Sequence, residues 1–276
     1  MSAYDYCRDK VALPGSSLYY SLLFVARETR EALTALHAAA EEWRAIAEQC
    51  TDENVARAKL GWWAEEIQRA VAGSPRHPVM QVLAPGLRRA KVDTGRLFGV
   101  LDAFAEHQSR ETYMTFAELE SHYERVADLT GCMAAELCGC ENAATLEASR
   151  HLGVALALTD VARRPQNGGG RRATDLPAEL LTQFQVAGAD LAATHTSPAL
   201  REAIRSVADG ARLRLRRALD EMPRDDHARQ RGRRALAEMT LAQLGAMKRG
   251  DYAMLEQPLA TTPLRKLWIA WKHRQT

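Results

Sequence analysis

Residues 197–222 read SPALREAIRSVADGARLRLRRALDEM, and this stretch decides the fold class. Its apolar residues recur three or four positions apart, which places them on one face of an α-helix. They are Leu200, Ile204, Val207, Ala211, Leu215 and Leu219. Ser197 followed by Pro198 supplies an N-cap and a first turn with a preset φ. The stretch therefore predicts a long amphipathic helix that begins at residue 198.

The same helical period runs through most of the remaining chain. It covers residues 28–48, 53–72, 93–108, 116–138, 143–164 and 228–248. Thr51-Asp52 precedes one helix, and Thr115 with Glu118 forms the pattern of a capping box. Expected breaks, marked by Pro, Gly and polar residues, fall at 72–78, 84–86, 165–172 and 260–263. Strand-like runs are nearly absent, so we predict one all-α domain over residues 1–276, with any ligand between facing helices.

Composition limits the class of protein. The 276 residues carry a formal net charge of +2, which is too small to indicate nucleic-acid binding. The five cysteines predict buried helical side chains rather than a disulfide framework or a zinc site. The first 30 residues contain no long apolar run, and no segment has the ~20 apolar residues that span a bilayer. We therefore expect a cytoplasmic protein without a nucleic-acid partner.

Carboxylates are concentrated in residues 37–49, HAAAEEWRAIAEQ. Carboxylates on one helix face can hold Mg²⁺, a hard cation that often bridges to substrate phosphates. Glu41 and Glu42 are adjacent, however, and therefore point about a quarter-turn apart. Arg44 lies within reach of both Glu41 and Glu48, in the spacing of intrahelical ion pairs. The segment is consistent with metal ligands and with a solvated helix face.

The stretch LALTDVARRPQNGGGRRATDLPAE (156–179) contains a second group of charges. Asp160 and Arg164 form an i,i+4 pair, with Arg163 beside them. A guanidinium at this position repels a divalent ion and cannot lose its proton. An ion pair at a helix end, before a Pro-Gly break, therefore fits better than a metal site.

Paired arginines provide the chemistry of an anion site that needs no metal, since a guanidinium binds phosphate bidentately. The pairs are Arg27 and Arg30, Arg88 and Arg89, and Arg171 and Arg172. Solvated surface arginines are the alternative interpretation. The glycines at 168–170 do not form a P-loop, because they lack the preceding strand and the Gly-Lys-Ser/Thr ending.

The C-terminal segment 263–276 carries an apolar stripe of Leu264, Leu267, Trp268 and Trp271. Basic residues flank the stripe, namely Arg265, Lys266, Lys272 and Arg274. A basic amphipathic helix of this kind lies in a membrane interface. The alternative is a terminal helix that docks on the core of the protein.

Several of these segments together resemble the squalene/phytoene synthases, which are all-helical enzymes that condense two prenyl diphosphates. Residues 15–40 are similar to the Ser-Ser-x-Tyr opening segment of that family. Residues 56–83 are similar in Trp62-Trp63, Glu66, Gly73 and His77-Pro78. Further segments that resemble the family are YMTFAELESHYERVADLTG (113–131), LGVALALTD (152–160), DLPAELL (175–181) and PLRKLWIAW (263–271). The resemblance implies the isoprenoid synthase fold, a helical bundle around a central cavity.

The residues that bind metal in this family are largely replaced here. The family carries two aspartate-rich motifs on facing helices, which hold Mg²⁺ against the substrate diphosphates. The first reads Glu41-Glu42-Trp43-Arg44-Ala45 here, and the second has Arg164 and Gly168 in place of its aspartates. The family tyrosine before Leu-Pro is Asp175. A third acidic segment has become 104–107, Phe-Ala-Glu-His, although Asp102 before it is kept.

The resemblance assigns candidate residues to each role. Those for diphosphate binding are Ser16, Ser17, Arg27, Arg30, Glu41, Glu42, Asp160, Arg163 and Arg164. For a metal they are Glu41, Glu42 and Asp160, and for catalysis they are Tyr123 and Asp102.

Three functions follow as hypotheses. The first is a protein of the squalene/phytoene synthase type that lacks the normal Mg²⁺-dependent prenyl transfer and binds an isoprenoid or a protein partner, as in an assembly role. The second is an active head-to-head prenyl transferase with a modified diphosphate site, and only this hypothesis requires Mg²⁺. The third is a peripheral membrane or interaction module that uses residues 263–276.

Overall fold

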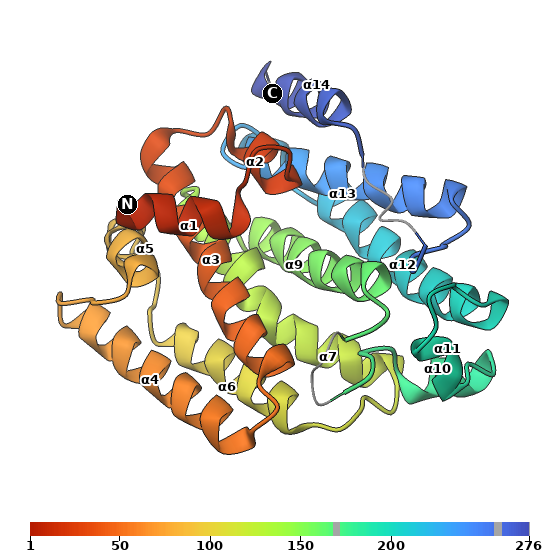
Figure 1. Cartoon of the computed structure of the whole chain (residues 1–276). Coiled ribbons are helices and arrows are strands. Elements are labelled where there is room, and N and C mark those ends of the chain that lie inside the picture. Colours follow the sequence, from red (N-terminus) through yellow and green to blue (C-terminus); the bar gives the residue numbers. More distant parts are fainter. Residues whose placement is uncertain (168–171, 257–260, 276) are drawn as a thin grey trace.

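The protein is described from a computed structural model, which defines residues 1–167, 172–256 and 261–275 (Figure 1). Within these ranges the chain is helical and has no β-strand. The helices are α1 (Ala3–Val11), α2 (Ser17–Leu22), α3 (Arg27–Gln49), α4 (Glu53–Val71), α5 (Pro78–Arg89), α6 (Arg96–Ser109), α7 (Phe116–Ala127), α8 (Ala134–Leu137), α9 (Ala143–Arg163), α10 (Ala178–Gln183), α11 (Gly188–Leu191), α12 (Pro198–Asp220), α13 (Arg231–Arg249) and α14 (Pro263–Lys272). The all-α fold class predicted from the sequence is confirmed.

Helix α9 is the centre of the bundle, with α3 and α7 on one side and α12 and α13 on the other (Figure 1). Buried side chains point in most directions from its axis, as expected for a helix that is enclosed on nearly all sides. They include Ala148, Leu152, Val154, Ala155, Leu158 and Ala162. Long neighbouring helices therefore cover α9 along its length.

Helix α12 confirms the prediction made from residues 197–222. It begins at Pro198, and the Ser197 hydroxyl accepts a hydrogen bond from the Leu200 amide at 3.2 Å. The residues of the expected face are buried against the bundle, except for Leu219, which is only partly buried.

The break expected at residues 84–86 is wrong, because α5 continues from Pro78 through Pro85 to Arg89. Pro85 removes one backbone donor, but the buried apolar face of α5 keeps the helix intact. Gly86 allows α5 to lie directly against α3, since a Cβ atom there would lie 2.6 Å from the Cβ atom of Ala32. The glycine therefore serves helix packing rather than a turn.

The single helix expected over residues 116–138 is interrupted by a π-helical segment, Asp128–Met133, between α7 and α8. At Gly131 the segment approaches α9 so closely that a Cβ atom would lie 2.6 Å from the Ser149 carbonyl oxygen. The buried Arg233 of α13 donates a hydrogen bond to the Thr130 carbonyl at 2.8 Å. This side chain thus satisfies a carbonyl of the irregular turn.

Helix α14 packs on α13 and α2 near the surface of the bundle (Figure 1). Ile269 and Ala270 are its buried residues, and they contact Ala235 and Met239 of α13. Across the described ranges, no helix combines the length and the apolar character that crossing a bilayer requires.

Two glycines allow a test of the packing between α7 and α9. A Cβ atom at Gly153 would lie 2.8 Å from the Cβ atom of Ala127, whereas a Cβ atom at Gly61 of α4 meets nothing within 4 Å. We expect Gly153→Ala to destabilise the protein by about 1–3 kcal/mol through overpacking. Gly61→Ala, the control, should stabilise it by about 0.5–1 kcal/mol through helix propensity. Urea unfolding measures both values, and a stabilising Gly153→Ala would contradict the close approach of the two helices.

Candidate functional site

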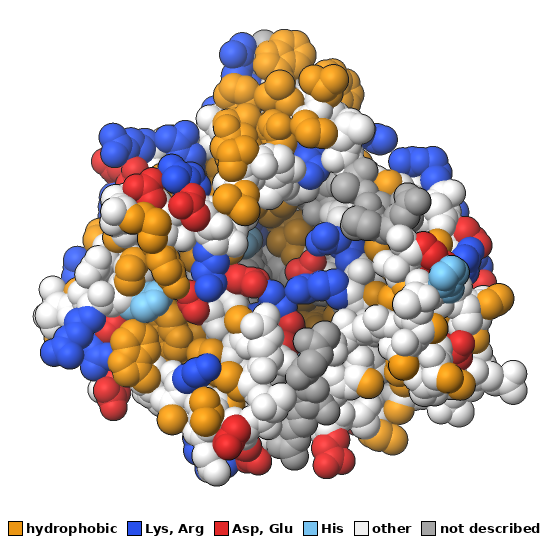
Figure 2. Space-filling model, viewed as in Figure 1, with side chains coloured by type: hydrophobic (Ala, Val, Ile, Leu, Met, Phe, Trp, Pro, Cys, Tyr) orange, Lys and Arg blue, Asp and Glu red, His pale blue; other side chains and the backbone are white. Residues whose placement is uncertain are grey.

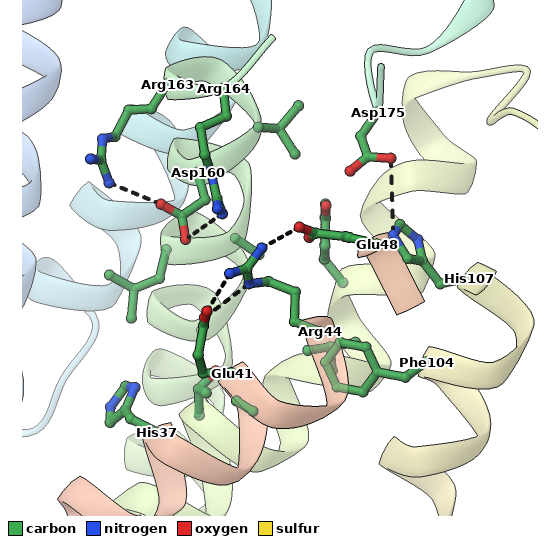
Figure 3. A pocket seen from close by; sticks show the side chains of 18 of the residues that line it. His37, Glu41, Arg44, Glu48, Phe104, His107, Asp160, Arg163, Arg164 and Asp175 are labelled. Atoms are coloured by element: carbon green, nitrogen blue, oxygen red, sulfur yellow. Dashed lines mark hydrogen bonds and ion pairs between the residues drawn. The ribbon is translucent and has the colours of Figure 1, made fainter. Parts of the chain in front are cut away.

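A cavity of about 550 Å³ lies between α3 and α9 (Figure 3). These two helices are the ones on which the sequence resemblance places the aspartate-rich motifs. The remaining lining comes from α1, α2, α6, α7, the π-helical segment and the segment that follows α9. The apolar part of the lining consists of Val11, Leu18, Ala40, Phe104, Val126, Leu156, Ala157 and Val161.

Helix α3 presents His37, Glu41, Arg44 and Glu48 to the cavity at helical spacing. The guanidinium of Arg44 occupies the space between the two glutamates. It donates to Glu41 from Nε at 3.0 Å and from Nη2 at 2.5 Å, and its Nη1 donates to Glu48 (Figure 3). The ion pairs expected for Arg44 are therefore confirmed, and both carboxylates already have a cation.

Helix α9 contributes Asp160 near its C-terminal end, where it is held by two arginines. Arg163 Nη1 lies 3.1 Å from Asp160 Oδ1, and Arg164 Nη2 lies 3.5 Å from Oδ2 (Figure 3). The Asp160–Arg164 pair read from the sequence is thus confirmed. Gly168, the other position at which an aspartate is expected, lies outside the described residues, as do Gly169, Gly170 and Arg171.

The carboxylate of Glu42 has different partners from those of its neighbour Glu41. The Tyr6 hydroxyl donates to its carboxylate, and Lys10 Nζ lies 2.8 Å from it. Glu42 also lines a second, open groove, together with Trp62 and Trp63 of α4. The three carboxylates named as metal candidates therefore have separate cationic or hydrogen-bonding partners rather than a shared centre in the described part of the chain.

The structure brings only some of the remaining candidates to the cavity. Tyr123 lines it, and burial raises the pKa of its hydroxyl well above the ordinary value. Ser16 is the N-cap of α2, Ser17 begins that helix, and Arg27 is exposed and paired with Glu31. Asp102 is exposed on α6. Within the described ranges, the cavity lining does not include Ser16, Ser17, Arg27, Arg30 or Asp102.

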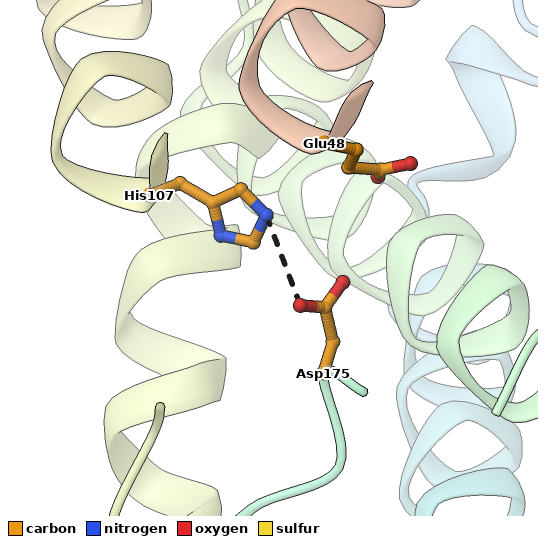
Figure 4. A group of neighbouring side chains, drawn as sticks. All are labelled: Glu48, His107 and Asp175. Carbon is orange, nitrogen blue, oxygen red and sulfur yellow. Dashed lines mark ion pairs between the residues drawn. The ribbon is translucent and has the colours of Figure 1, made fainter. Parts of the chain in front are cut away.

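Glu48, His107 and Asp175 are the described residues whose positions most resemble a metal site (Figure 4). One donor atom from each lies within 4.8 Å of the others. Arg172, however, donates to His107 Nε2 at 2.5 Å and to Asp175 Oδ1 at 3.0 Å. Because a guanidinium already occupies the donor atoms of His107 and Asp175, the three residues do not fit a divalent metal.

Arg172 also fixes the segment that follows α9 to the end of α6. Its Nη1 donates to the carbonyl oxygens of His107 and Arg110, and its side chain is only 4% exposed. The sequence indicated Arg172 only as one of several paired arginines, and Asp175 only as a replacement for a family tyrosine. Their spacing of three residues was the one available signal, since the contact with α6 crosses more than 60 positions.

Burial determines the protonation states of the cavity histidines. It lowers the pKa of His37 to about 4, with a further contribution from the positive charge of Arg233. It also lowers the pKa of His107 well below its usual value, and Arg172 acts in the same direction. Burial raises the pKa of Glu48, against the opposing effect of Arg44. Burial likewise lowers the pKa of His122, the third histidine of the lining, to about 2. At neutral pH the three imidazoles are therefore uncharged, and the cations at the cavity are arginine and lysine side chains.

The fold and the cavity define an all-helical protein of the isoprenoid synthase type. The chain matches the family model described as squalene/phytoene synthase over residues 11–267. It therefore belongs to the squalene/phytoene synthase family.

Two curated relatives illustrate the range of proteins in this family. "NADH dehydrogenase (ubiquinone) complex I, assembly factor 6" of Rattus norvegicus is 22% identical over 199 residues, which cover 72% of this chain and 60% of the relative. "15-cis-phytoene synthase" of Synechococcus elongatus is 24% identical over 205 residues, which cover 68% of this chain and 65% of the relative. The chain thus spans slightly less than two thirds of the length of both relatives.

Among solved structures, a dehydrosqualene synthase in complex with ligand superposes with a TM-score of 0.78. The match is 18% identical and covers 99% of this chain and 95% of the other. At this identity the comparison supports the fold and not the activity.

The buried contacts of Arg172 can be tested by substitution. We expect Arg172→Met to destabilise the protein by about 3–5 kcal/mol, because it leaves Asp175 buried without its cation. Arg163→Met, which removes an exposed ion pair, should cost less than about 1 kcal/mol. Chemical unfolding of both variants gives the comparison. Equal losses would show that Arg172 does not anchor the segment.

Proposed function

We propose that this chain does not carry out Mg²⁺-dependent prenyl transfer and that it acts as a binding or assembly protein built on the squalene/phytoene synthase fold. The observation that supports this most directly is that Glu41, Glu48 and Asp160 are each paired with an arginine. A Mg²⁺ ion bound to a diphosphate requires free oxygen ligands in near-octahedral geometry. Here, metal binding would have to displace a guanidinium from each carboxylate.

The arginines come from the same helices as the acids they neutralise. Arg44 lies on α3 between Glu41 and Glu48, and Arg163 and Arg164 follow Asp160 by three and four positions. Such short-range pairs form whenever the helix forms. The replacement of acids by arginines therefore changes the cavity from a cation site into a set of ion pairs.

The cavity remains suited to an apolar chain. Its volume of about 550 Å³ lies within the range of ~300–1,000 Å³ that is usual for small-molecule sites. Apolar side chains from α1, α2, α3, α6, α7 and α9 form part of its lining. We infer that its ligand is an uncharged isoprenoid rather than a prenyl diphosphate.

A protein partner is the other part of the proposal. A relative named as a complex I assembly factor aligns with 72% of this chain, which supports an assembly role on this fold. The relatives named as phytoene synthases support the alternative, an active prenyl transferase with a modified site.

A turnover assay separates these alternatives. With farnesyl or geranylgeranyl diphosphate and Mg²⁺, we expect no diphosphate release above the enzyme-free rate. Isothermal titration should detect no specific Mg²⁺ binding in the wild type. The triple variant Arg44→Gln, Arg163→Gln, Arg164→Gln should show measurable Mg²⁺ binding, because it removes the arginine partners of Glu41 and Asp160. A wild-type product that disappears in both Glu41→Gln and Asp160→Asn would establish the active-enzyme alternative instead.

The ligand can be examined by thermal unfolding with matched probes. Farnesol or geranylgeraniol should raise the Tm, because a ligand that binds only the folded state adds about 2.7 kcal/mol of stability at a hundredfold excess over Kd. The corresponding diphosphate with Mg²⁺ should give no larger shift. Ala157→Trp, which fills the cavity, should abolish the effect of the alcohol. A shift with the diphosphate alone would contradict an uncharged ligand.

A further inference from the structure

Helix α14 presents an apolar face that the bundle leaves uncovered. Leu264 is 79% exposed, Leu267 42%, Trp268 59% and Trp271 49%. At helical spacing these side chains form one ridge, on the side of the helix away from the buried Ile269 and Ala270. Figure 2 shows hydrophobic side chains gathered at this end of the molecule, next to a hollow in the same face. The docking of α14 on α13 therefore accounts for Ile269 and Ala270 and leaves the four side chains of the ridge uncovered.

Cationic side chains border the ridge. Arg265, Lys272 and Arg274 are exposed, and residues 261–275 contain no acid. Glu238 of α13 is the acid that contacts this end of α14, and it pairs with Lys272 at 3.6 Å and His273 at 2.9 Å. The ridge and its borders thus carry a net positive charge.

Arg234 adds a cation on α13, next in sequence to Ala235, which contacts α14. It lies on α13 one helical turn before Glu238 and is partly buried. Its Nε and Nη1 atoms are buried and have no hydrogen-bond partner among the described residues. Unpaired guanidinium donors in such a position are suited to an anionic oxygen ligand.

We propose that α14 docks on an anionic lipid bilayer, with its apolar ridge inserted among the acyl chains and the bordering cations on the headgroups. Helices that lie in a membrane interface carry Trp and Leu on one face, with Lys and Arg beside them. Tryptophan in particular is enriched at the level of the headgroups. A ridge of four side chains on a ten-residue helix also offers less surface than the ~800 Å² per partner of a standard protein interface.

Docking in this way brings the cavity close to the bilayer. Lys266 of α14 donates to the Gly15 carbonyl at 2.7 Å. Gly15 belongs to the connection between α1 and α2, and this connection joins Val11 and Leu18 of the cavity lining. An apolar ligand can then pass between bilayer and cavity without crossing bulk water. This last step rests on the proposed function, whereas the docking itself does not.

Vesicle co-sedimentation of the full chain, without added ligand, tests the docking. We expect binding to vesicles of phosphatidylcholine with about one third phosphatidylglycerol, and weaker binding to pure phosphatidylcholine or at high salt. Trp268→Glu and Trp271→Glu should each reduce the apparent partition coefficient by about tenfold or more. Two matched controls, Trp62→Glu on α4 (41% exposed) and Leu213→Glu on α12 (55% exposed), should bind as the wild type does.

Arg234→Gln tests the headgroup contact separately. It should weaken binding to the anionic vesicles by about threefold, while the exposed Arg216→Gln of α12 should have no effect. Circular dichroism of each variant shows that the fold is retained.

Absence of vesicle binding, or equal losses in the control variants, overturns the proposal. A dimer in light scattering that Trp268→Glu abolishes also overturns it, and assigns the ridge to a second copy of the chain. If vesicle binding holds but farnesol does not raise the Tm, only the proposed ligand fails.

Discussion

The enclosure of α9 is the constraint on which the rest of the structure depends. A helix with buried side chains on most sides needs neighbours along its length, and α7, the π-helical segment, α12 and α13 provide them. Small residues set these distances, since Gly153 allows α7 to approach and Gly131 brings the π-helical segment against Ser149. Only near its C-terminal end does α9 present charged side chains to the cavity. The packing thereby decides where any chemistry of this fold takes place.

The carboxylates that α3 and α9 present to the cavity are each held by an arginine. Asp160 is held by the arginines that follow it, and Glu41 and Glu48 are held by Arg44. The chain has the fold of the squalene/phytoene synthase family, and its cavity carboxylates form ion pairs with arginines. This is the separation expected when the fold is determined by its core and the function by a small site placed on it.

The cavity and the exposed ridge of α14 are linked through the connection between α1 and α2. Lys266 contacts Gly15, and the residues on either side of this connection, Val11 and Leu18, line the cavity. The apolar part of the cavity lining and an apolar surface with a positive border thus lie at neighbouring positions. A protein that exchanges a hydrophobic ligand with a membrane requires these two features together.

The sequence by itself determined the helices, the capping of α12 by Ser197 and the ion pairs of Arg44 and Asp160, because all of these depend on residues within about four positions of one another. It did not predict the π-helical segment, the continuation of α5 through Pro85 or the role of Arg172. Each of these is stabilised by a contact with a distant helix: Arg233 with Thr130, Gly86 with Ala32, and Arg172 with His107.

The apolar stripe of α14 could likewise be read from residues 263–276. Only the tertiary structure decided that Ile269 and Ala270 hold this helix on the bundle while the tryptophans remain exposed, because burial depends on which neighbouring helix is present and not on spacing alone.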